Sequence, residues 1–461
     1  MLGIHELRAE IDGLKNEVEV CRNEITDLIK QSQQVVANAY AAERMIDDKV
    51  SQLVISSERI QRKLQYTNFE LENLSSGQKD GKNILLVGYY GATNLGDELM
   101  LETICSSFMH NGRANITVLL DDNDQLDVPY YKEYSYIHLP LTVHELVMME
   151  SRFDMVLIGG GAVLEDTNYE LKDGRYSLGR FVVDICIRFI QAKKPALIYA
   201  VSAANDITNN EYINKLAYVV KNAEYFSCRD PYSIDFLRKI GIDTENIRLV
   251  EDVVLANSKL EKFTKKQQNK SGKKEIGVVF IYNDSQLKNL SILKDFLVYL
   301  MKILDDHFET KYKLKLIPFF THDKYDEMCC RNIISEYGDE KFEYVDMKQD
   351  YEAFLHVCEN LDYAISMRYH ATLLFNVLGI PTLDIMWDTH HHYEFKVNYI
   401  YQKYSKERYE LKFSDLINKK YDLTQIEEWL KGKEISVKGN IIGEAQDQLN
   451  ILGKNINKLL N

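Results

Sequence analysis

Residues 83–98 read NILLVGYYGATNLGDE, and this stretch decides the fold class. It starts as a short apolar run, typical of a buried strand, and passes through a glycine-rich turn into a helix-forming segment. A strand that leads through glycines into a helix is typical of α/β folds with a parallel sheet. The glycine spacing does not fit the dinucleotide fingerprint. Asp97 and Glu98 also stand where a P-loop carries Lys and Ser or Thr, so an ordinary NTP-binding loop is disfavoured.

The rest of the chain repeats this alternation of strand and helix. One series of short β-rich runs lies at 84–89, 116–120, 155–158, 196–201, 225–228 and 247–250, and a second lies at 276–282, 314–320, 344–346, 363–366 and 382–386. The lysine-rich stretch 259–274 separates them. Strands spaced by helix-length segments predict parallel sheets with right-handed crossovers. We therefore expect two Rossmann-like domains, with the ligand site in the cleft beyond the carboxyl ends of their strands.

The first 75 residues follow a different pattern. From Leu7 onward apolar residues recur at alternating steps of three and four, with one phase shift between Ile46 and Val50. This predicts an N-terminal α-helical coiled coil and self-association, with a long helical hairpin as the alternative. The predicted domains are then the coiled coil, the N-terminal Rossmann-like domain, the C-terminal Rossmann-like domain and a helical tail, at 1–75, 82–258, 274–400 and 401–461.

Composition excludes several classes of protein. With 56 basic and 70 acidic residues the net charge is −14, which disfavours a surface that binds duplex nucleic acid. No apolar run approaches the roughly 18 to 20 residues of a membrane helix, and no signal-peptide core is present at the start. The 7 cysteines are an odd set without CxxC spacing. We expect a cytoplasmic protein, with peripheral association at the inner face of the membrane as an open alternative.

Four motifs follow predicted strands, where residues of such a cleft are expected to lie. In the first, Gly91, Asn94, Gly96, Asp97 and Glu98 surround a predicted helix start, whose free amides can hold an oxyanion or a sugar hydroxyl. Capping of the helix by the two carboxylates is an equally good interpretation.

The other three motifs add glycines, arginines and a histidine. Gly160 and Gly161 follow a strand and permit close approach of a ligand, or only an unusual turn. Arg229 ends another strand, where it can bind an anion or pair with a neighbouring carboxylate. Arg368 and His370 open an apolar helix and combine an anion binder with a titratable group.

In chain order, the motifs GYYGATNLGDE, LIGGGAVLED, CRDPYS and SMRYHATLLFNVLGIPTL resemble the polysaccharide pyruvyl transferase family, over roughly 83–396. The resemblance implies a fold like that of B-type glycosyltransferases. It also implies transfer of the pyruvyl group of phosphoenolpyruvate to sugar hydroxyls of a surface-polysaccharide precursor, forming a ketal. Tyr369 departs from the family pattern, which usually has leucine there.

The resemblance also implies roles for the residues. Arg229 and Arg368 match arginines that hold the phosphate and carboxylate of the donor, and His370 matches a proton-transferring histidine. The acidic loop is expected near the acceptor sugar or as a proton donor. Neither cofactor nor metal is required by the sequence, and a divalent cation stays open.

Two rival functions remain, a nucleotide-sugar glycosyltransferase and a non-catalytic assembly protein. The expected partners are phosphoenolpyruvate and a saccharide acceptor, lipid-linked or free. A second copy of the chain and a membrane assembly complex are further expected partners, and nucleic acid is not expected.

Overall fold

The structure is a computed structural model, and two compact units, 1–78 and 79–461, make up the chain. It describes residues 20, 22, 81–91, 93–109, 114–120, 135–138, 143–167, 177–263, 272–282, 288–309, 311–320, 325–347, 351–388, 391–404, 407–432 and 440–460. The predicted coiled coil lies outside the described residues, apart from Val20 and Arg22, and stays a prediction. No helix in the described ranges combines the length and the apolar character that crossing a bilayer demands.

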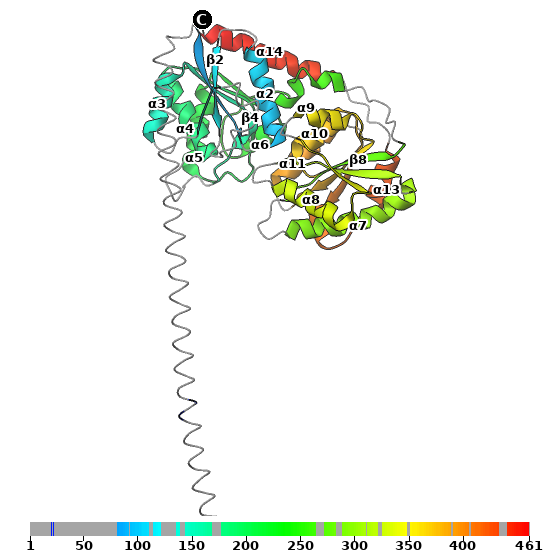
Figure 1. Ribbon diagram of the computed structural model, residues 1–461. Helices are drawn as coiled ribbons and strands as arrows, with labels where there is room; N and C mark the ends of the chain where they lie inside the picture. Colours follow the sequence, from blue (N-terminus) through cyan, green and yellow to red (C-terminus); the bar gives the residue numbers. More distant parts are fainter. Residues whose placement is uncertain are drawn as a thin grey trace, which may run out of the picture. The chain divides into compact units, whose positions relative to one another are not determined.

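The described part of the second unit contains a seven-stranded sheet in the order β3-β2-β1-β4-β5-β6-β7 (Figure 1). Its strands are β1 Lys82–Val87, β2 Ala114–Leu120, β3 Ser135–His138, β4 Met155–Leu164, β5 Ala196–Ala203, β6 Tyr225–Cys228 and β7 Arg248–Leu249. All neighbouring strands are parallel. The interior strand β5 is buried at every position, which explains its nearly continuous apolar sequence.

A second parallel sheet, of six described strands, has the order β10-β9-β8-β11-β12-β13. Its strands are β8 Lys274–Val279, β9 Tyr312–Leu316, β10 Phe342–Tyr344, β11 Tyr363–Ser366, β12 Thr382–Met386 and β13 Tyr409–Lys412. The predicted α/β class with two parallel sheets is thus confirmed.

The helices of the first half are α2 Leu95–Met109, α3 Val143–Arg152, α4 Leu178–Gln191, α5 Asn210–Asn222 and α6 Pro231–Lys239, with the 3₁₀ helices η2 Val253–Ala256 and η3 Leu260–Phe263. Those of the second half are α7 Lys288–Phe308, α8 Tyr325–Tyr337, α9 Tyr351–Cys358, α10 Tyr369–Val377, α11 His391–Tyr404, α12 Phe413–Ile417, α13 Leu423–Lys431 and α14 Ile441–Leu460.

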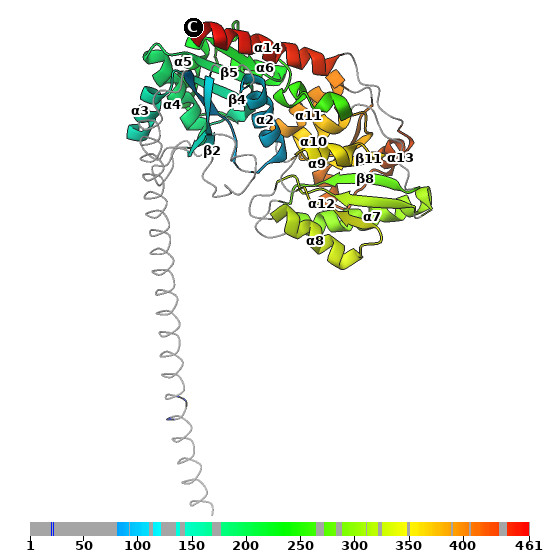
Figure 2. The same ribbon diagram turned by 45° about the horizontal axis from the view of Figure 1, so that its top comes forward.

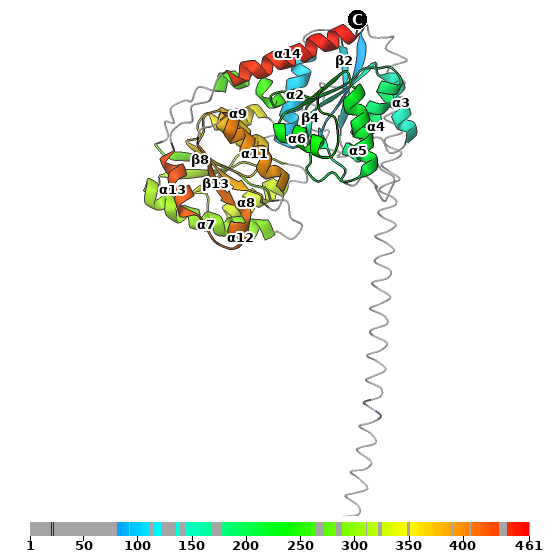
Figure 3. The same ribbon diagram turned by 180° about the vertical axis from the view of Figure 1, so that it is seen from behind.

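The helices divide between the two faces of the second sheet. Side chains of α7, α8, α12 and α13 form one core with the sheet, while those of α9 and α10 join the core of the first sheet. Figure 2 shows α7 and α8 on one side of the second sheet and α9 and α10 on the other. The last helix, α14, lies along α2 and η2 of the first half, as seen from both sides of the molecule (Figure 3). One continuous apolar core therefore holds α2 and α10, and these two helices carry the first and last motifs.

Two edge strands, β3 and β13, are not among the strands predicted from the sequence. The strand β13 reads YELK, and only Tyr409 and Leu411 are buried while the intervening Glu410 is half-buried. Four residues are too few for periodicity to distinguish a strand from part of a helix. The strand forms because it pairs with β12, which the local sequence does not show.

Candidate active site

His370 is held in place by the start of α10. Strand β11 ends at Ser366, and Arg368 is the N-cap residue of the helix, so the second helical residue is His370. Its side chain is only 7% exposed. A Cβ atom at Gly96 would lie 2.0 Å from His370 Nδ1, so the imidazole rests directly on the backbone of α2. Glycine at position 96 is therefore a steric requirement of the histidine.

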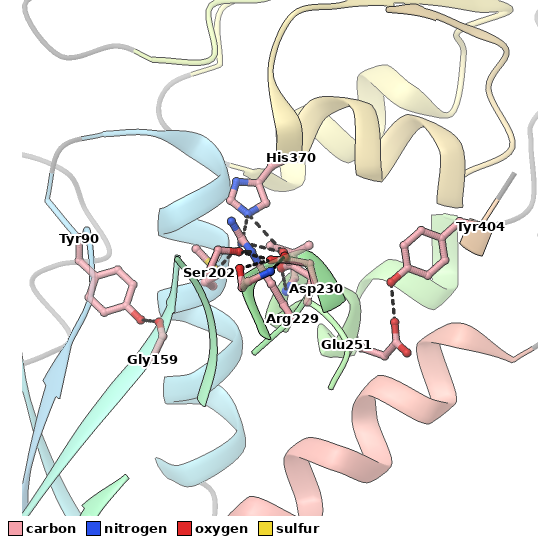
Figure 4. A network of polar contacts seen from close by, with 12 residues as sticks. Tyr90, Gly159, Ser202, Arg229, Asp230, Glu251, His370 and Tyr404 are labelled. Atoms are coloured by element: carbon pink, nitrogen blue, oxygen red, sulfur yellow. Dashed lines mark hydrogen bonds and ion pairs between the residues drawn. The ribbon is translucent and has the colours of Figure 1, made fainter. Parts of the chain in front are cut away.

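Arg229 follows strand β6 and contacts His370 across the boundary between the two sheets' domains (Figure 4). Its Nη1 lies 3.0 Å from His370 Nε2 and donates to Asp252 Oδ2 at 2.7 Å, while its Nε donates to Ser202 Oγ at 2.9 Å. Because a guanidinium only donates, Nε2 must be the acceptor in the contact with Arg229. His370 is therefore neutral, with its proton on Nδ1.

Asp252 is the carboxylate that balances Arg229. It lies after β7, where it caps η2 by accepting from Val254 N at 3.1 Å, and it is 2% exposed. Burial raises the pKa of this carboxyl, but the guanidinium of Arg229, the contact with His370 and the amide of Val254 together outweigh burial and hold the pKa well below its usual range. The pair is therefore a fixed, fully ionised unit.

The pKa of His370 reflects two opposing effects. Burial lowers it below the usual value, while the Asp252 carboxylate, 3.6 Å from Nε2, raises it. Burial prevails, which agrees with a neutral ring that accepts from Arg229.

Tyr369 explains one departure from the family pattern. The guanidinium carbon of Arg229 lies 4.5 Å from the centre of the Tyr369 ring. This is the geometry of a cation–π contact, so the tyrosine ring adds to the hydrogen bonds that hold the arginine.

Arg368 forms its hydrogen bonds with residues of the second half of the chain, and within the described residues none of them joins it to Arg229 or His370. Its Nη2 donates to Asp326 Oδ2 at 3.0 Å, and its Nε donates to the carbonyl of Phe280 at 3.4 Å. Its Nη1, like Nη2 of Arg229, has no hydrogen-bond partner among the described residues. Each arginine thus has one terminal nitrogen that makes no hydrogen bond to the described residues.

Asp97 links the two arginines electrostatically. It is 6% exposed, and burial raises its pKa to about 8, with Arg229 and Arg368 lowering it and Glu98 and Asp252 raising it. A carboxyl group with this pKa carries its proton at neutral pH.

The other residues of the glycine-rich loop shape the backbone. Glu98 Oε1 accepts from Gly91 N at 3.0 Å and from Thr93 N at 3.1 Å, and Asn94 Oδ1 accepts from Gly96 N at 3.3 Å. The capping interpretation is therefore the better one for Glu98 and Asn94, whereas Asp97 makes no such cap.

Gly160 and Gly161 lie within β4, which runs further than the sequence indicated. Their φ angles are +77° and +82°, and the pairing of β4 with β5 shifts register after Gly161. A Cβ at Gly160 would lie 2.6 Å from Met100 Sδ, and one at Gly161 would lie 3.7 Å from Asp97 Oδ1. Glycine is needed here for backbone conformation and for the close approach of α2.

The sequence interpretation missed Asp252, Asp326 and Lys396. Asp252 follows a strand of the same sheet edge as Arg229, so the strand-end rule already points to it. Lys396 lies within α11, 7% exposed, and no motif marks it. No group of three His, Cys, Asp or Glu residues with metal-binding geometry occurs in the described part of the chain, and the side chains of His390, His391 and His392 lie outside it.

Comparison with solved structures identifies the fold. UDP-GlcNAc 2-epimerase from Methanocaldococcus jannaschii matches with a TM-score of 0.52 at 12% identity, covering 81% of this chain and 99% of that one. The UDP-GlcNAc 2-epimerase from Neisseria meningitidis covers 82% and 100% at 12% identity, with a TM-score of 0.44. The first match shows the predicted B-type glycosyltransferase fold of two Rossmann-like domains. No curated protein matches the chain.

Comparison with family models identifies the family. The model described as polysaccharide pyruvyl transferase matches residues 94–389, which include the glycine-rich loop and all three of Arg229, Arg368 and His370. Since this match spans more than half of the 461 residues, the chain belongs to the polysaccharide pyruvyl transferase family.

Proposed function

We propose that this protein transfers the pyruvyl group of phosphoenolpyruvate to two hydroxyls of a saccharide acceptor, forming a pyruvate ketal and releasing phosphate. The observation that carries the proposal is the 3.0 Å contact between Arg229 Nη1 and His370 Nε2, two motif residues that are 141 positions apart. It brings a fixed cation and a proton acceptor to the carboxyl ends of strands from two sheets. Family membership supports the pyruvyl donor and the saccharide acceptor.

In the proposed first step, Asp97 protonates the methylene carbon of the donor. Because burial keeps this carboxyl protonated at neutral pH, it can act as a general acid where an ordinary aspartate cannot. Protonation of the carbon leaves an oxocarbenium-like centre at C2, and one acceptor hydroxyl adds there. That hydroxyl gives its proton to the Asp97 carboxylate, where it replaces the proton delivered to carbon.

In the second step, the phosphate departs as the second hydroxyl adds to the same carbon. His370 takes the proton of the attacking hydroxyl and passes it to the leaving phosphate, so that the protons balance. The free nitrogens of Arg229 and Arg368 bind the phosphate and carboxylate groups and stabilise their charge throughout. A donor that engages Arg229 also competes with its contact to Nε2 and frees the imidazole.

The proposal is tested by incubating the full chain with phosphoenolpyruvate and nitrophenyl glycosides of common hexoses and N-acetylhexosamines. We expect phosphate release and a ketal methyl signal by NMR, with one deuteron in the methyl group when the reaction is run in D₂O. Parallel reactions with nucleotide sugars in place of phosphoenolpyruvate test the glycosyltransferase alternative. Consumption of the nucleotide sugar alone would overturn the pyruvyl assignment, and inertness toward both donors would favour an assembly protein.

The role of Asp97 predicts a basic limb in the pH profile. The active form is protonated, and its pKa is raised to about 8, so kcat/KM is expected to fall as the pH rises through 8. Asp97→Asn keeps the shape but cannot donate a proton, and it should lower kcat by about 10² to 10⁴.

Lys396 titrates in the same range, because burial lowers its pKa to about 8. The Asp97→Asn variant therefore identifies the acid, and the profile alone does not. Glu98→Gln is the matched control at the next position, and we expect it to weaken the loop without removing the basic limb. A full basic limb in the residual activity of Asp97→Asn would contradict the assignment.

A further inference from the structure

Asp384 brings a buried carboxyl group next to the strand that leads into the last motif. It lies on β12, where its partner in the sheet register is Ser366, the final residue of β11. Asp384 is 1% exposed, and no lysine, arginine or histidine of the described chain forms an ion pair with it. Burial raises the pKa of this carboxyl to about 7, because a buried charge without a cation is costly. The proposed reaction steps do not use this group.

Two hydroxyl groups bind the carboxylate in place of a cation. Thr372 Oγ1 donates to Asp384 Oδ1 at 2.5 Å, and Tyr401 Oη donates to Oδ2. The two hydroxyls come from different helices, Thr372 from α10 and Tyr401 from α11. Each carboxylate oxygen therefore has a donor from the protein interior, so Asp384 acts on the site only through its neighbours.

One of the two hydroxyls continues toward the site. Thr372 Oγ1 also lies 2.9 Å from Ser366 Oγ. Ser366 Oγ accepts from Arg368 N at 3.2 Å and lies 3.1 Å from the carbonyl oxygen of Arg368. That carbonyl also accepts from Thr372 N at 2.9 Å. Ser366, Thr372 and Asp384, here named the Asp384 chain, thus hold both backbone polar groups of Arg368.

The start of α10 lacks the usual side-chain cap. Serine, threonine, aspartate or asparagine at the N-cap position commonly holds the first turn of a helix. Here the N-cap residue is Arg368, whose side chain forms no capping hydrogen bond and donates to Asp326 instead. The Asp384 chain therefore takes the place of the cap, and it fixes the residue from which the helix and His370 begin.

The site tolerates little displacement of this helix start. The His370 ring rests on the backbone of α2, where a Cβ at Gly96 would lie 2.0 Å from Nδ1. Its Nε2 lies 3.0 Å from Arg229 Nη1. A shift of α10 would either break the contact with Arg229 or press the ring into α2. Misplacement of a reacting group by about 1 Å can lower a rate by about 10².

We propose that Asp384 is a positioning residue for the pyruvyl transfer proposed above, on which this inference rests. Through Thr372 and Ser366 it fixes the start of α10, and with it the arginine and the histidine of the last motif. Tyr401 binds the same carboxylate, but no hydrogen bond of the described residues continues from it to Arg368. The two hydroxyls therefore predict different effects on catalysis.

The test compares these two hydroxyls. Thr372→Val removes the link toward Arg368 and keeps a similar shape, and Tyr401→Phe is the matched control that removes only the other bond. Each variant takes one donor from a buried carboxylate, so we expect both to lower Tm. Only Thr372→Val should lower kcat/KM for phosphoenolpyruvate, by about 10- to 100-fold, in assays well below both Tm values. Thr372→Ser restores the hydroxyl and should regain most of the rate.

A second readout does not depend on turnover. In the ligand-free full chain, the ring-nitrogen NMR signals of His370 report on its contact with Arg229, and the spectrum of His370→Gln identifies them. We expect Thr372→Val to shift these signals and Tyr401→Phe to leave them in place. Asp384→Leu removes both bonds, so it should resemble Thr372→Val in rate and signals with a larger loss of Tm.

A purely structural role of the carboxylate predicts a different result. Thr372→Val and Tyr401→Phe would then lower Tm while kcat/KM and the His370 signals stay as in the wild type, which would overturn the inference and leave the proposed function intact. An equal loss of rate in both variants would also overturn it, since the link through Ser366 would then have no special part. If the wild-type chain does not consume phosphoenolpyruvate, the proposed function fails, and the His370 signals decide whether Asp384 positions the histidine.

Discussion

Arg229→Met is expected to lower kcat/KM for phosphoenolpyruvate by about 10² to 10³, the usual effect of removing one fixed donor to a developing negative charge. The same substitution should lower the free energy of unfolding by about 3 to 5 kcal/mol, because it leaves Asp252 as a buried charge without its partner. Steady-state phosphate release and thermal unfolding of the same preparations measure both effects.

A second substitution separates the two effects of Arg229→Met. The double variant Arg229→Met/Asp252→Asn removes both charges, so we expect it to regain most of the stability and none of the activity. Arg238→Met is a matched control on α6, since Arg238 pairs with Asp235 on the exposed surface and should change neither quantity appreciably. Wild-type kcat/KM in either Arg229 variant would exclude the arginine from donor binding.

His370→Gln is expected to lower kcat by about 10² to 10⁴ while changing the KM for phosphoenolpyruvate much less. The physical reason is that the imidazole transfers protons, whereas the arginines provide the binding charge. Glutamine fills part of the space above Gly96 and still accepts from Arg229, so the fold and the arginine should stay in place. Initial rates over a range of donor concentrations give the two constants.

The pH profile provides a second readout for His370. Burial lowers its pKa below the usual value, so in the wild type activity should fall only at a pH below the normal range of histidine. This acidic limb should vanish from the residual activity of His370→Gln. His356→Gln, an exposed histidine of α9 paired with Glu359, should leave rate and profile as in the wild type. If the acidic limb is unchanged in His370→Gln, a group other than His370 produces that limb.

The strands of both sheets were largely predictable from the sequence, because a buried parallel strand needs a short, nearly continuous apolar run. Interior strands such as β5 and β12 are buried at every position, and their apolar runs predict them. The edge strands β3 and β13 were not, since only part of each is buried. The limits of β4 were also missed, because the glycines at 159–161 continue the strand instead of ending it.

The motif residues were also predictable from the sequence, but the role of each residue was not. Asp97 and Glu98 are adjacent in sequence and chemically alike, yet Glu98 binds backbone amides of its own loop, while burial raises the pKa of Asp97 to about 8. Burial and the direction of each side chain produce that difference, and neither is encoded in the local pattern.

By itself, the sequence determined the fold class, the four motifs and the resemblance to a family, because each depends on residue types at short separations along the chain. Only the tertiary structure decided that Arg229 meets His370 and that Asp252 and Asp326 pair with the two arginines. These relations join positions far apart in the chain. Their energies arise from distance and desolvation, which exist only once the two sheets and the helices between them have packed together.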